Sequence, residues 1–404
     1  QYFLDAEILS FSSFKNLNLT DNGLGYLVLV LLIIGICRKN KIDNRYCVGL
    51  LLLAITIISP IVNLTSCYIA ASLFLTFFYI FYEVGEFRTE SLWRNSLLVS
   101  LPLSTLVTLK STFIPVVVVL FFGYYYINKI KNADFIGVIK EMALTALIIF
   151  VLILPWMLSM YGSSGTMLYP ILGKGYYGTV YGAFQHNIEL NFYSLIRLIS
   201  ESIQSATFIL PLLFLAVLSL FMPKNKETKI LKLILYSSLF GLLSIIFFIG
   251  GYALYYYSFP YVLPTLIFSC LIFLDDNFHL QNKSFFRSKL IALIFIAFLS
   301  GAFLQKDMTL IGESKNNINI DGEKIKIGLM NSDILNDAEY KQYQDLQKSV
   351  PVGEIIIARL DKNYLFDFKR NPVYINDIPG GASLPPGIPL KKGSEAVADY
   401  FIKH

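Results

Sequence analysis

Ten long apolar segments follow one another along the first three quarters of the chain, separated by short polar stretches. They comprise residues 22–37, 47–63, 66–82, 95–109, 112–128, 141–160, 206–222, 230–250, 258–274 and 290–304. A helix that crosses a bilayer needs about 20 predominantly apolar residues, with a range of roughly 17 to 25. The pattern therefore predicts an α-helical polytopic membrane protein with about ten spans.

The segment 95–109 is the least regular of the ten. Pro102 interrupts it, and Lys110 follows its last residue. A helix that lies along the membrane surface or re-enters the membrane also fits this segment. A full span is the preferred interpretation, because the alternation of charge in the later loops requires one.

Lys and Arg are concentrated in every second gap between the apolar segments. Sixteen of them lie in or beside the gaps that follow the first, third, fifth, seventh and ninth segments, and only four lie in the opposite set, which includes the first 21 residues. Cytoplasmic loops carry the excess of basic residues. The pattern predicts an extracytoplasmic stub at 1–21, a transmembrane domain at 22–304 with an extracytoplasmic loop at 161–205, and an extracytoplasmic domain at 305–404.

The composition agrees with a membrane protein. Hydrophobic residues make up 55% of the chain and charged residues 15%, against about 25% charged residues in soluble domains. The net charge of +5 is explained by the basic cytoplasmic loops and gives no reason to expect a nucleic-acid partner. The four cysteines lack metal-ligand spacing and are expected to behave as small apolar residues. No metal or cofactor is expected.

The tail at 305–404 changes abruptly to a polar composition. Residues 338–348 and 396–403 predict helices, with Ser394 as the N-cap of the second, and residues 354–360 and 373–376 predict strands. This order is typical of a small α/β domain. We expect a further strand after His404, and at least one span before Gln1, because no signal peptide precedes the extracytoplasmic stub.

Four residues in the extracytoplasmic loops and stub are candidates for chemistry. Lys110 lies at the outer end of two spans, where it either binds a phosphate in the headgroup layer or extends to the surface. Lys174, between two glycines, suits an anionic headgroup, although a solvated lysine explains it as well. His186 and Asp5 are weak candidates for a base. The Gly- and Tyr-rich loop around Lys174 is also compatible with a packed interfacial loop that binds nothing.

Several short motifs resemble those of one membrane enzyme family. They are Thr108-Leu109-Lys110-Ser111-Thr112, Pro155-Trp156 with the later Gly165-Thr166-Met167-Leu168-Tyr169-Pro170, Tyr257-Ser258-Phe259-Pro260-Tyr261-Val262-Leu263-Pro264 and, in the tail, 350–354, 365–368 and 385–389. Their order and predicted sidedness resemble the bacterial GT-C fold glycosyltransferases, which use lipid-linked sugars. The resemblance covers nearly the whole chain.

The resemblance implies an enzyme of the bacterial plasma membrane. Such an enzyme transfers a hexosyl or pentosyl group, with inversion, from a polyprenyl-phosphate donor in the membrane to an extracytoplasmic glycan or lipid acceptor. Lys110, Tyr169, Lys174 and Tyr257 are then expected to bind the donor. The catalytic carboxylate is expected before Gln1, and Tyr255 and Tyr256 stand where many relatives carry Arg.

Two other classes of function fit the same pattern. A transporter or flippase of a lipid-linked glycan is the first, although the chain shows no repeat of fixed period and few charges inside its apolar segments. A non-catalytic membrane assembly protein, with the tail as its binding element, is the second. A cavity open to the outer leaflet alone favours the enzyme, and one that passes through both leaflets favours transport.

Overall fold

The structure of the protein is a computed structural model that describes residues 20–56, 67–84, 92–128, 135–164, 167, 206–222, 225–249, 254–274, 337–358, 365–367, 369–375 and 393–403. The chain forms two compact units. One comprises Gln1–Ile153 and Phe192–Ser332, and the other comprises Leu154–Asn191 and Asp333–His404.

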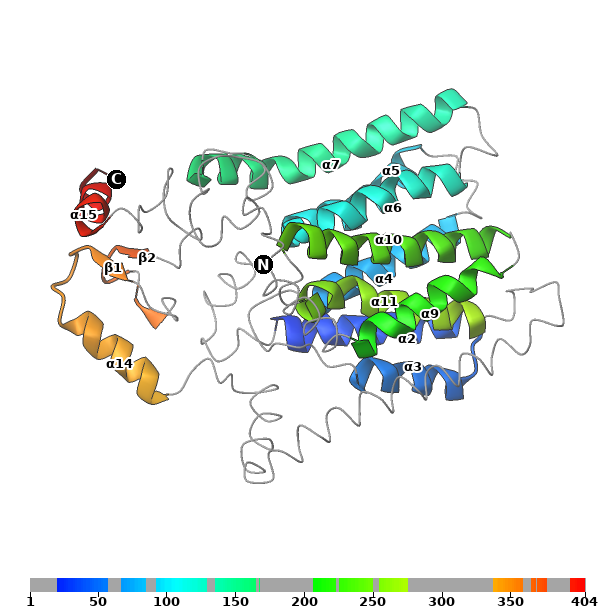
Figure 1. The fold of residues 1–404 in the computed structure, drawn as a ribbon, viewed down its shortest axis with the longest axis horizontal. Helices are drawn as coiled ribbons and strands as arrows, with labels where there is room; N and C mark the ends of the chain where they lie inside the picture. The colour runs from blue at the N-terminus through cyan, green and yellow to red at the C-terminus, as the bar shows by residue number, and fades with distance from the viewer. Residues whose placement is uncertain are drawn as a thin grey trace, which may run out of the picture. The chain divides into compact units, whose positions relative to one another are not determined.

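The first unit is helical wherever the structure describes regular elements (Figure 1). In chain order its elements are η2 (Thr20–Gly25, a π-helix), α2 (Tyr26–Lys39), α3 (Asn44–Thr56), α4 (Cys67–Val84), α5 (Leu92–Leu109), η3 (Ser111–Phe113), α6 (Ile114–Asn128), α7 (Phe135–Ser164, shared with the second unit), α9 (Ala206–Leu220), α10 (Lys226–Ile249) and α11 (Leu254–Leu274). Nine of the ten predicted apolar segments overlap these helices, although residues 57–63 of the second segment lie outside the described residues. The tenth, 290–304, lies outside the described residues.

Three stretches in the described part of the chain are long and apolar enough to cross a membrane. They are Ile136–Leu158 in α7, Lys226–Ile246 in α10 and Tyr256–Leu274 in α11. The apolar helices Asn44–Ala54, Cys67–Glu83, Ile114–Ile127 and Ile209–Leu220 are shorter. The uncertain segment 95–109 forms a continuous helix, α5, with Pro102 inside it. The helical class is therefore confirmed. Among the described residues, three helices are both long enough and apolar enough to span a membrane.

Helix α11 lies at the centre of the first unit. Within the unit it packs against α4, α10, α9 and α3, and 94% of its apolar window is buried, compared with 22% for α7. A helix that is apolar on all sides and buried belongs to the core of a bundle. Helix α7 is also apolar but is mostly exposed, so it has the surface expected of a helix in contact with lipid.

A glycine allows two helices of the bundle to approach closely. A Cβ atom added at Gly123 in α6 would lie 2.2 Å from Leu233 Cδ2 in α10. Small residues at such positions are typical of helix packing in membranes, where van der Waals contact between the helices drives association. The close contact explains why α6 and α10 form one of the main pairs of the unit.

The second unit contains α14 (Asp337–Lys348), β1 (Ile356–Ala358), β2 (Val373–Ile375) and α15 (Ser394–Lys403). The two strands pair in parallel, with Ile356 opposite Val373 and Ala358 opposite Ile375. The side chains of Ile356, Ala358 and Phe366 form a small core. The predicted helices and strands of the tail coincide with these elements, although β1 begins two residues later than predicted. Residues 359–360 and 376 of the predicted strands lie outside the described residues.

The start of α15 differs from the prediction. Ser394 is the first residue of the helix and is not its N-cap. The Val397 N–H donates to the Gly393 carbonyl oxygen at 3.3 Å, so that Gly393 occupies the capping position. Gly393 has a φ of +91°, a backbone conformation that a serine would adopt only with strain.

Candidate functional site

Four segments that are distant in sequence meet at one end of the helical unit. They are η2, the first turn of α4, the turn between α5 and η3, and the first turn of α11; hydrogen bonds, ring contacts and electrostatic interactions join them. The basic-loop pattern predicts the same side of the membrane for all four. We call this convergence the Lys110 site, after the cation at its centre.

Asp21 connects η2 to the beginning of α4. Its Oδ2 accepts hydrogen bonds from the backbone N–H groups of Cys67 (2.7 Å) and Tyr68 (3.1 Å), and its Oδ1 accepts one from Ile69 (2.9 Å). The first N–H groups of a helix have no partner within the helix, and a negative charge beside them is favourable. A carboxylate about 46 residues upstream thus caps α4.

The backbone of η2 fits tightly against α4 at Gly25. A Cβ atom there would lie 2.7 Å from Ile69 Cγ1 and 2.9 Å from the Ile69 backbone nitrogen. The Ser72 hydroxyl donates to the Gly25 carbonyl oxygen at 3.1 Å. A π-helical turn is rare and often occurs at functional sites. Here the π-helical turn contains the buried carboxylate of Asp21, which is only 4% exposed.

Lys110 lies in the short turn between α5 and η3. Its N–H donates to the Leu106 carbonyl oxygen (3.2 Å), and its own carbonyl oxygen accepts from the Phe113 N–H (3.1 Å). The side chain is half-buried. Its Nζ lies 3.7 Å from the ring centroid of Tyr256 and 4.4 Å from that of Tyr257. Both distances fall within the range of about 6 Å for a cation–π interaction.

Aromatic rings join the lysine to the rest of the site. Tyr256 and Tyr257 are in edge contact with a centroid separation of 4.9 Å. Farther along the same helix, Phe259 makes an edge contact with Tyr68 at 5.5 Å, and Tyr68 makes one with Tyr26 at 5.1 Å. These pairs link the beginnings of α2, α4 and α11. Edge contacts of this kind favour one relative orientation of the rings.

The surroundings of Lys110 make its ammonium group easier to deprotonate than that of a lysine in water. Burial lowers the pKa of Lys110 to about 8, against the opposing electrostatic effects of Cys67 and Asp21. The Asp21 carboxylate is committed to three backbone donors at the start of α4. The tyrosine rings stabilise the ammonium without neutralising it. The arrangement is therefore able to supply a positive charge to an anionic ligand.

Two of the residues predicted to bind substrate lie together in this site. Lys110 and Tyr257, which are far apart in the sequence, are in contact. Tyr169 and Lys174 lie outside the described residues, so their assignment stays a prediction, and the same is true of His186 and Asp5.

Sequence reasoning missed Asp21 and the contact role of Tyr256. The predicted boundary placed Asp21 in a polar stub at 1–21, whereas the structure buries it against α4. The sequence did hold a signal for a role of Asp21. This residue immediately precedes the first apolar segment on the predicted outer side, and the third segment begins on the same side. The sequence gives no sign of the pairing itself.

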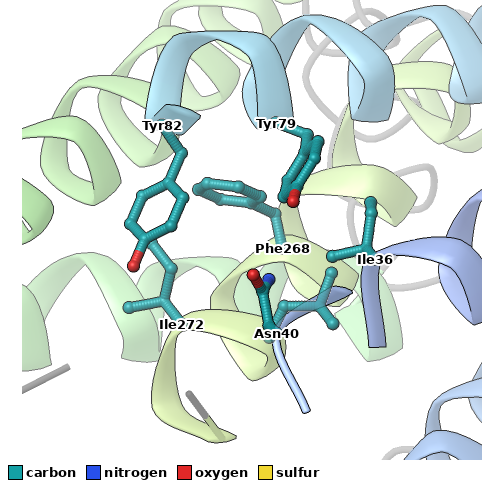
Figure 2. A pocket seen from close by; sticks show the side chains of 7 residues that line it. Ile36, Asn40, Tyr79, Tyr82, Phe268 and Ile272 are labelled. Carbon is teal, nitrogen blue, oxygen red and sulfur yellow. The ribbon is translucent and has the colours of Figure 1, made fainter. Parts of the chain in front are cut away.

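The opposite ends of α2, α4 and α11 enclose a small hollow (Figure 2). Its lining consists of Ile36, Asn40, Tyr79, Tyr82, Phe268, Leu271 and Ile272. About 10 Å³ is open to the centre of a water molecule, which is room for roughly one water. The hollow is smaller than a sugar or a lipid headgroup.

No group of three His, Cys, Asp or Glu side chains in the described part of the chain is arranged to hold a metal ion.

The three long apolar helices indicate a helical membrane protein. In comparisons with known proteins, no family model, curated protein or solved structure matches the chain.

Proposed function

We propose that the protein is an integral-membrane glycosyltransferase of GT-C-like architecture, with about ten spans and an extracytoplasmic C-terminal domain. It takes a sugar from a polyprenyl-phosphate carrier and transfers it to a glycan or lipid acceptor outside a bacterial plasma membrane. The proposal rests on one observation above all. Lys110, which lies in a turn between two apolar helices, is held on the rings of Tyr256 and Tyr257.

The position of Lys110 suits the phosphate of a lipid-linked donor. When the sugar leaves, the carrier phosphate departs as an anion and requires a cation or backbone donors to stabilise it. A lysine at the end of an apolar helix supplies a compact charge with three donors at the depth of the lipid headgroups. The two rings restrict the ammonium to a small region, which favours a defined position for the phosphate.

The described residues include groups suited to binding the donor phosphate, and they are less suited to removing the proton from the acceptor hydroxyl. Asp21 accepts three backbone hydrogen bonds, and a carboxylate whose lone pairs are occupied in this way is a poor acceptor for a substrate proton. We therefore assign Asp21 a positioning role. Tyr169 and Lys174 are proposed to complete the donor site.

A transfer assay tests the proposal. The full chain, in native membranes, is supplied with an isotope-labelled polyprenyl-phosphate sugar, and transfer of the label is measured. Lys110→Met keeps the apolar stem and removes the charge, and should lower transfer at least tenfold. Lys140→Met is the matched control, because Lys140 is an exposed lysine on a helix of the same unit and should leave transfer unchanged.

Two results would contradict the proposal. The first is equal transfer by Lys110→Met and the unaltered protein. The second concerns topology and is measured by cysteine labelling of intact cells at positions 186 and 367. If His186 and Asp367 are accessible only from the cytosol, the site does not share a compartment with the donor and the acceptor.

One observation favours the transporter alternative. Glu141 in α7 is only 7% exposed, and its neighbours include the Tyr125 hydroxyl, which lies 2.6 Å from Thr145 Oγ1. Carboxyl groups buried in membrane helices often mark ion or proton paths. However, Glu141 follows Ile136, the first residue of the candidate span, by only about 7.5 Å of helix. Transporter sites lie near the middle of the bilayer, so the transferase remains the better-supported function.

A further inference from the structure

The turn between α2 and α3 carries a group of exposed basic side chains. Arg38 lies in the last turn of α2, Lys41 in the connecting turn and Arg45 in the first turn of α3, and all three are exposed. A fourth basic residue, Lys39, forms an ion pair with Glu83. Within the described part of the chain, no carboxylate forms an ion pair with the other three. We call Arg38, Lys41 and Arg45 the basic turn.

Backbone hydrogen bonds fix the conformation of the basic turn. The Ile42 N–H donates to the Cys37 carbonyl oxygen (2.9 Å), and the Lys41 N–H donates to that of Arg38 (3.2 Å). These two bonds form the Schellman motif that ends many helices. The motif places Lys41 in the left-handed region, with a φ of +53°, and the side chain of Ile42 is buried behind it. The basic turn is therefore a defined part of the fold.

Two of the basic residues occupy positions where the local structure favours another residue. Glycine is usual at the left-handed position of a Schellman motif, yet Lys41 fills it. Arg45 is the second residue of α3, where a positive charge opposes the helix dipole. The nearest carboxylate in the sequence, Asp43, accepts a hydrogen bond from the Arg45 backbone N–H (2.9 Å). Neither positive charge stabilises the turn itself, which indicates a role toward a partner outside it.

The surface next to the basic turn identifies the kind of partner. Leu31 lies two helical turns before Arg38 on the same face of α2, and Val48 and Leu52 follow Arg45 on one face of α3. Each of these three apolar side chains is at least half exposed. Exposed apolar side chains followed by exposed basic ones match the boundary between the acyl chains and the headgroups of a bilayer. A nucleic acid or an acidic protein would leave the apolar part of this surface uncovered.

We propose that the basic turn binds the headgroup phosphate of an anionic phospholipid in the leaflet at this end of the helical unit. Lys and Arg beside membrane helices attract anionic lipids, and the guanidinium groups of Arg38 and Arg45 suit the geometry of a phosphate. A zwitterionic headgroup brings its own ammonium group and is therefore bound less well. This inference is independent of the proposed transferase activity and of the Lys110 site. The alternating basic loops predict that this leaflet is the cytoplasmic one.

The test measures lipid binding to the full chain. The protein is purified in detergent and titrated with phosphatidylglycerol or phosphatidylethanolamine, and bound lipid is measured by native mass spectrometry. The anionic lipid should bind about tenfold more tightly than the zwitterionic one. The triple variant Arg38→Gln, Lys41→Gln, Arg45→Gln should lose this preference. The control variant Lys341→Gln, Lys348→Gln, Lys369→Gln removes the same charge from exposed lysines of the other unit and should keep the preference.

A single substitution separates lipid binding from folding. Glycine suits the φ of +53° at position 41, so Lys41→Gly should not lower the thermal unfolding temperature. The same substitution removes one positive charge from the basic turn, and the affinity for phosphatidylglycerol should fall by about threefold. Lys41→Arg keeps the charge and should keep the affinity.

Three results would overturn the inference. One is equal affinity of the unaltered protein for the two lipids. Another is a triple variant of the basic turn that keeps the preference for phosphatidylglycerol. The third is displacement of bound phosphatidylglycerol by a roughly hundredfold excess of inorganic phosphate, which would mean a site for small anions and not for a lipid. The first and third measurements need no variant, so a folding defect cannot obscure them.

Discussion

At each end of the helical unit a lysine ammonium lies beside a tyrosine ring, and the two ends differ in whether a carboxylate neutralises that charge. At one end, Lys39 forms an ion pair with Glu83 (2.8 Å) and its Nζ lies 5.1 Å from the Tyr79 ring centroid, while the Tyr79 hydroxyl donates to the same carboxylate. At the other end, Lys110 lies closer to its rings, and the nearby carboxylate, Asp21, is bound by backbone N–H groups.

The difference shows what makes a cation available to a ligand. A carboxylate in direct contact neutralises Lys39, and half of its side chain remains in solvent. Lys110 is more confined, and the rings beside it hold its charge without cancelling it. Of these two lysines, Lys110 is therefore the one suited to binding an anion.

The largest effect is expected from Asp21→Ala. The substitution removes the acceptor of three backbone hydrogen bonds at the buried start of α4. Hydrogen bonds to charged groups are stronger than neutral ones, and unsatisfied buried donors are unfavourable, so we expect a loss of about 2–4 kcal/mol. Unfolding in mixed detergent micelles, followed by circular dichroism, measures it. Asp43→Ala is the control, since exposed Asp43 caps only its own turn through the Arg45 N–H. Equal stability of the two variants would contradict the capping role.

Gly25→Ala should have the second-largest effect. The added Cβ would meet Ile69, including a backbone nitrogen that cannot move away by changing its rotamer. Overpacking of this kind destabilises by roughly 1–3 kcal/mol. Gly35→Ala in α2 is the matched control, because nothing lies within 4 Å of its added Cβ, and the removal of a helical glycine should stabilise by up to about 1 kcal/mol. The same denaturation measurement distinguishes the two signs.

Binding of the donor should weaken as the pH rises. Burial lowers the pKa of Lys110 to about 8, so the free site loses its proton, and with it the charge that binds the anion, between pH 7 and 9. An isoprenyl-phosphoryl sugar is a phosphodiester and keeps its charge over that range. Its affinity, measured by fluorescence in nanodiscs, should therefore fall by about tenfold from pH 7 to pH 9. In Lys110→Met the affinity should be low at both values, and an unchanged pH profile in that variant would exclude Lys110 as the titrating group.

The smallest effect is expected from Lys39→Met. The ion pair with Glu83 is partly in solvent, with 54% of the lysine side chain exposed. Pairs of this kind contribute about 0–1 kcal/mol. We expect little change in unfolding and none in donor binding. A loss of donor affinity comparable with that of Lys110→Met would mean that the two ends are not distinct in the way the contacts indicate.

Much of the fold followed from patterns that act locally. The apolar segments coincide with helices because segment length and composition are properties of the segment itself. The strand Ile356–Ala358 was also found locally, as a β-branched run after Pro351 and Gly353. Ser394 shows the limit of such reasoning: serine is a common N-cap residue, but the backbone conformation at this position favours Gly393.

The amino-acid sequence by itself determined that the chain is rich in apolar helices, that its basic loops alternate, and that Lys110 and Tyr257 are candidates for binding a substrate. These features depend on neighbours in sequence. Only the tertiary structure decided that Asp21 caps a helix about 46 residues away and that Tyr256 and Tyr257 lie beside Lys110. Such pairings arise from the way the helices pack, and helices with apolar surfaces on every side carry little local information about which partner each one meets.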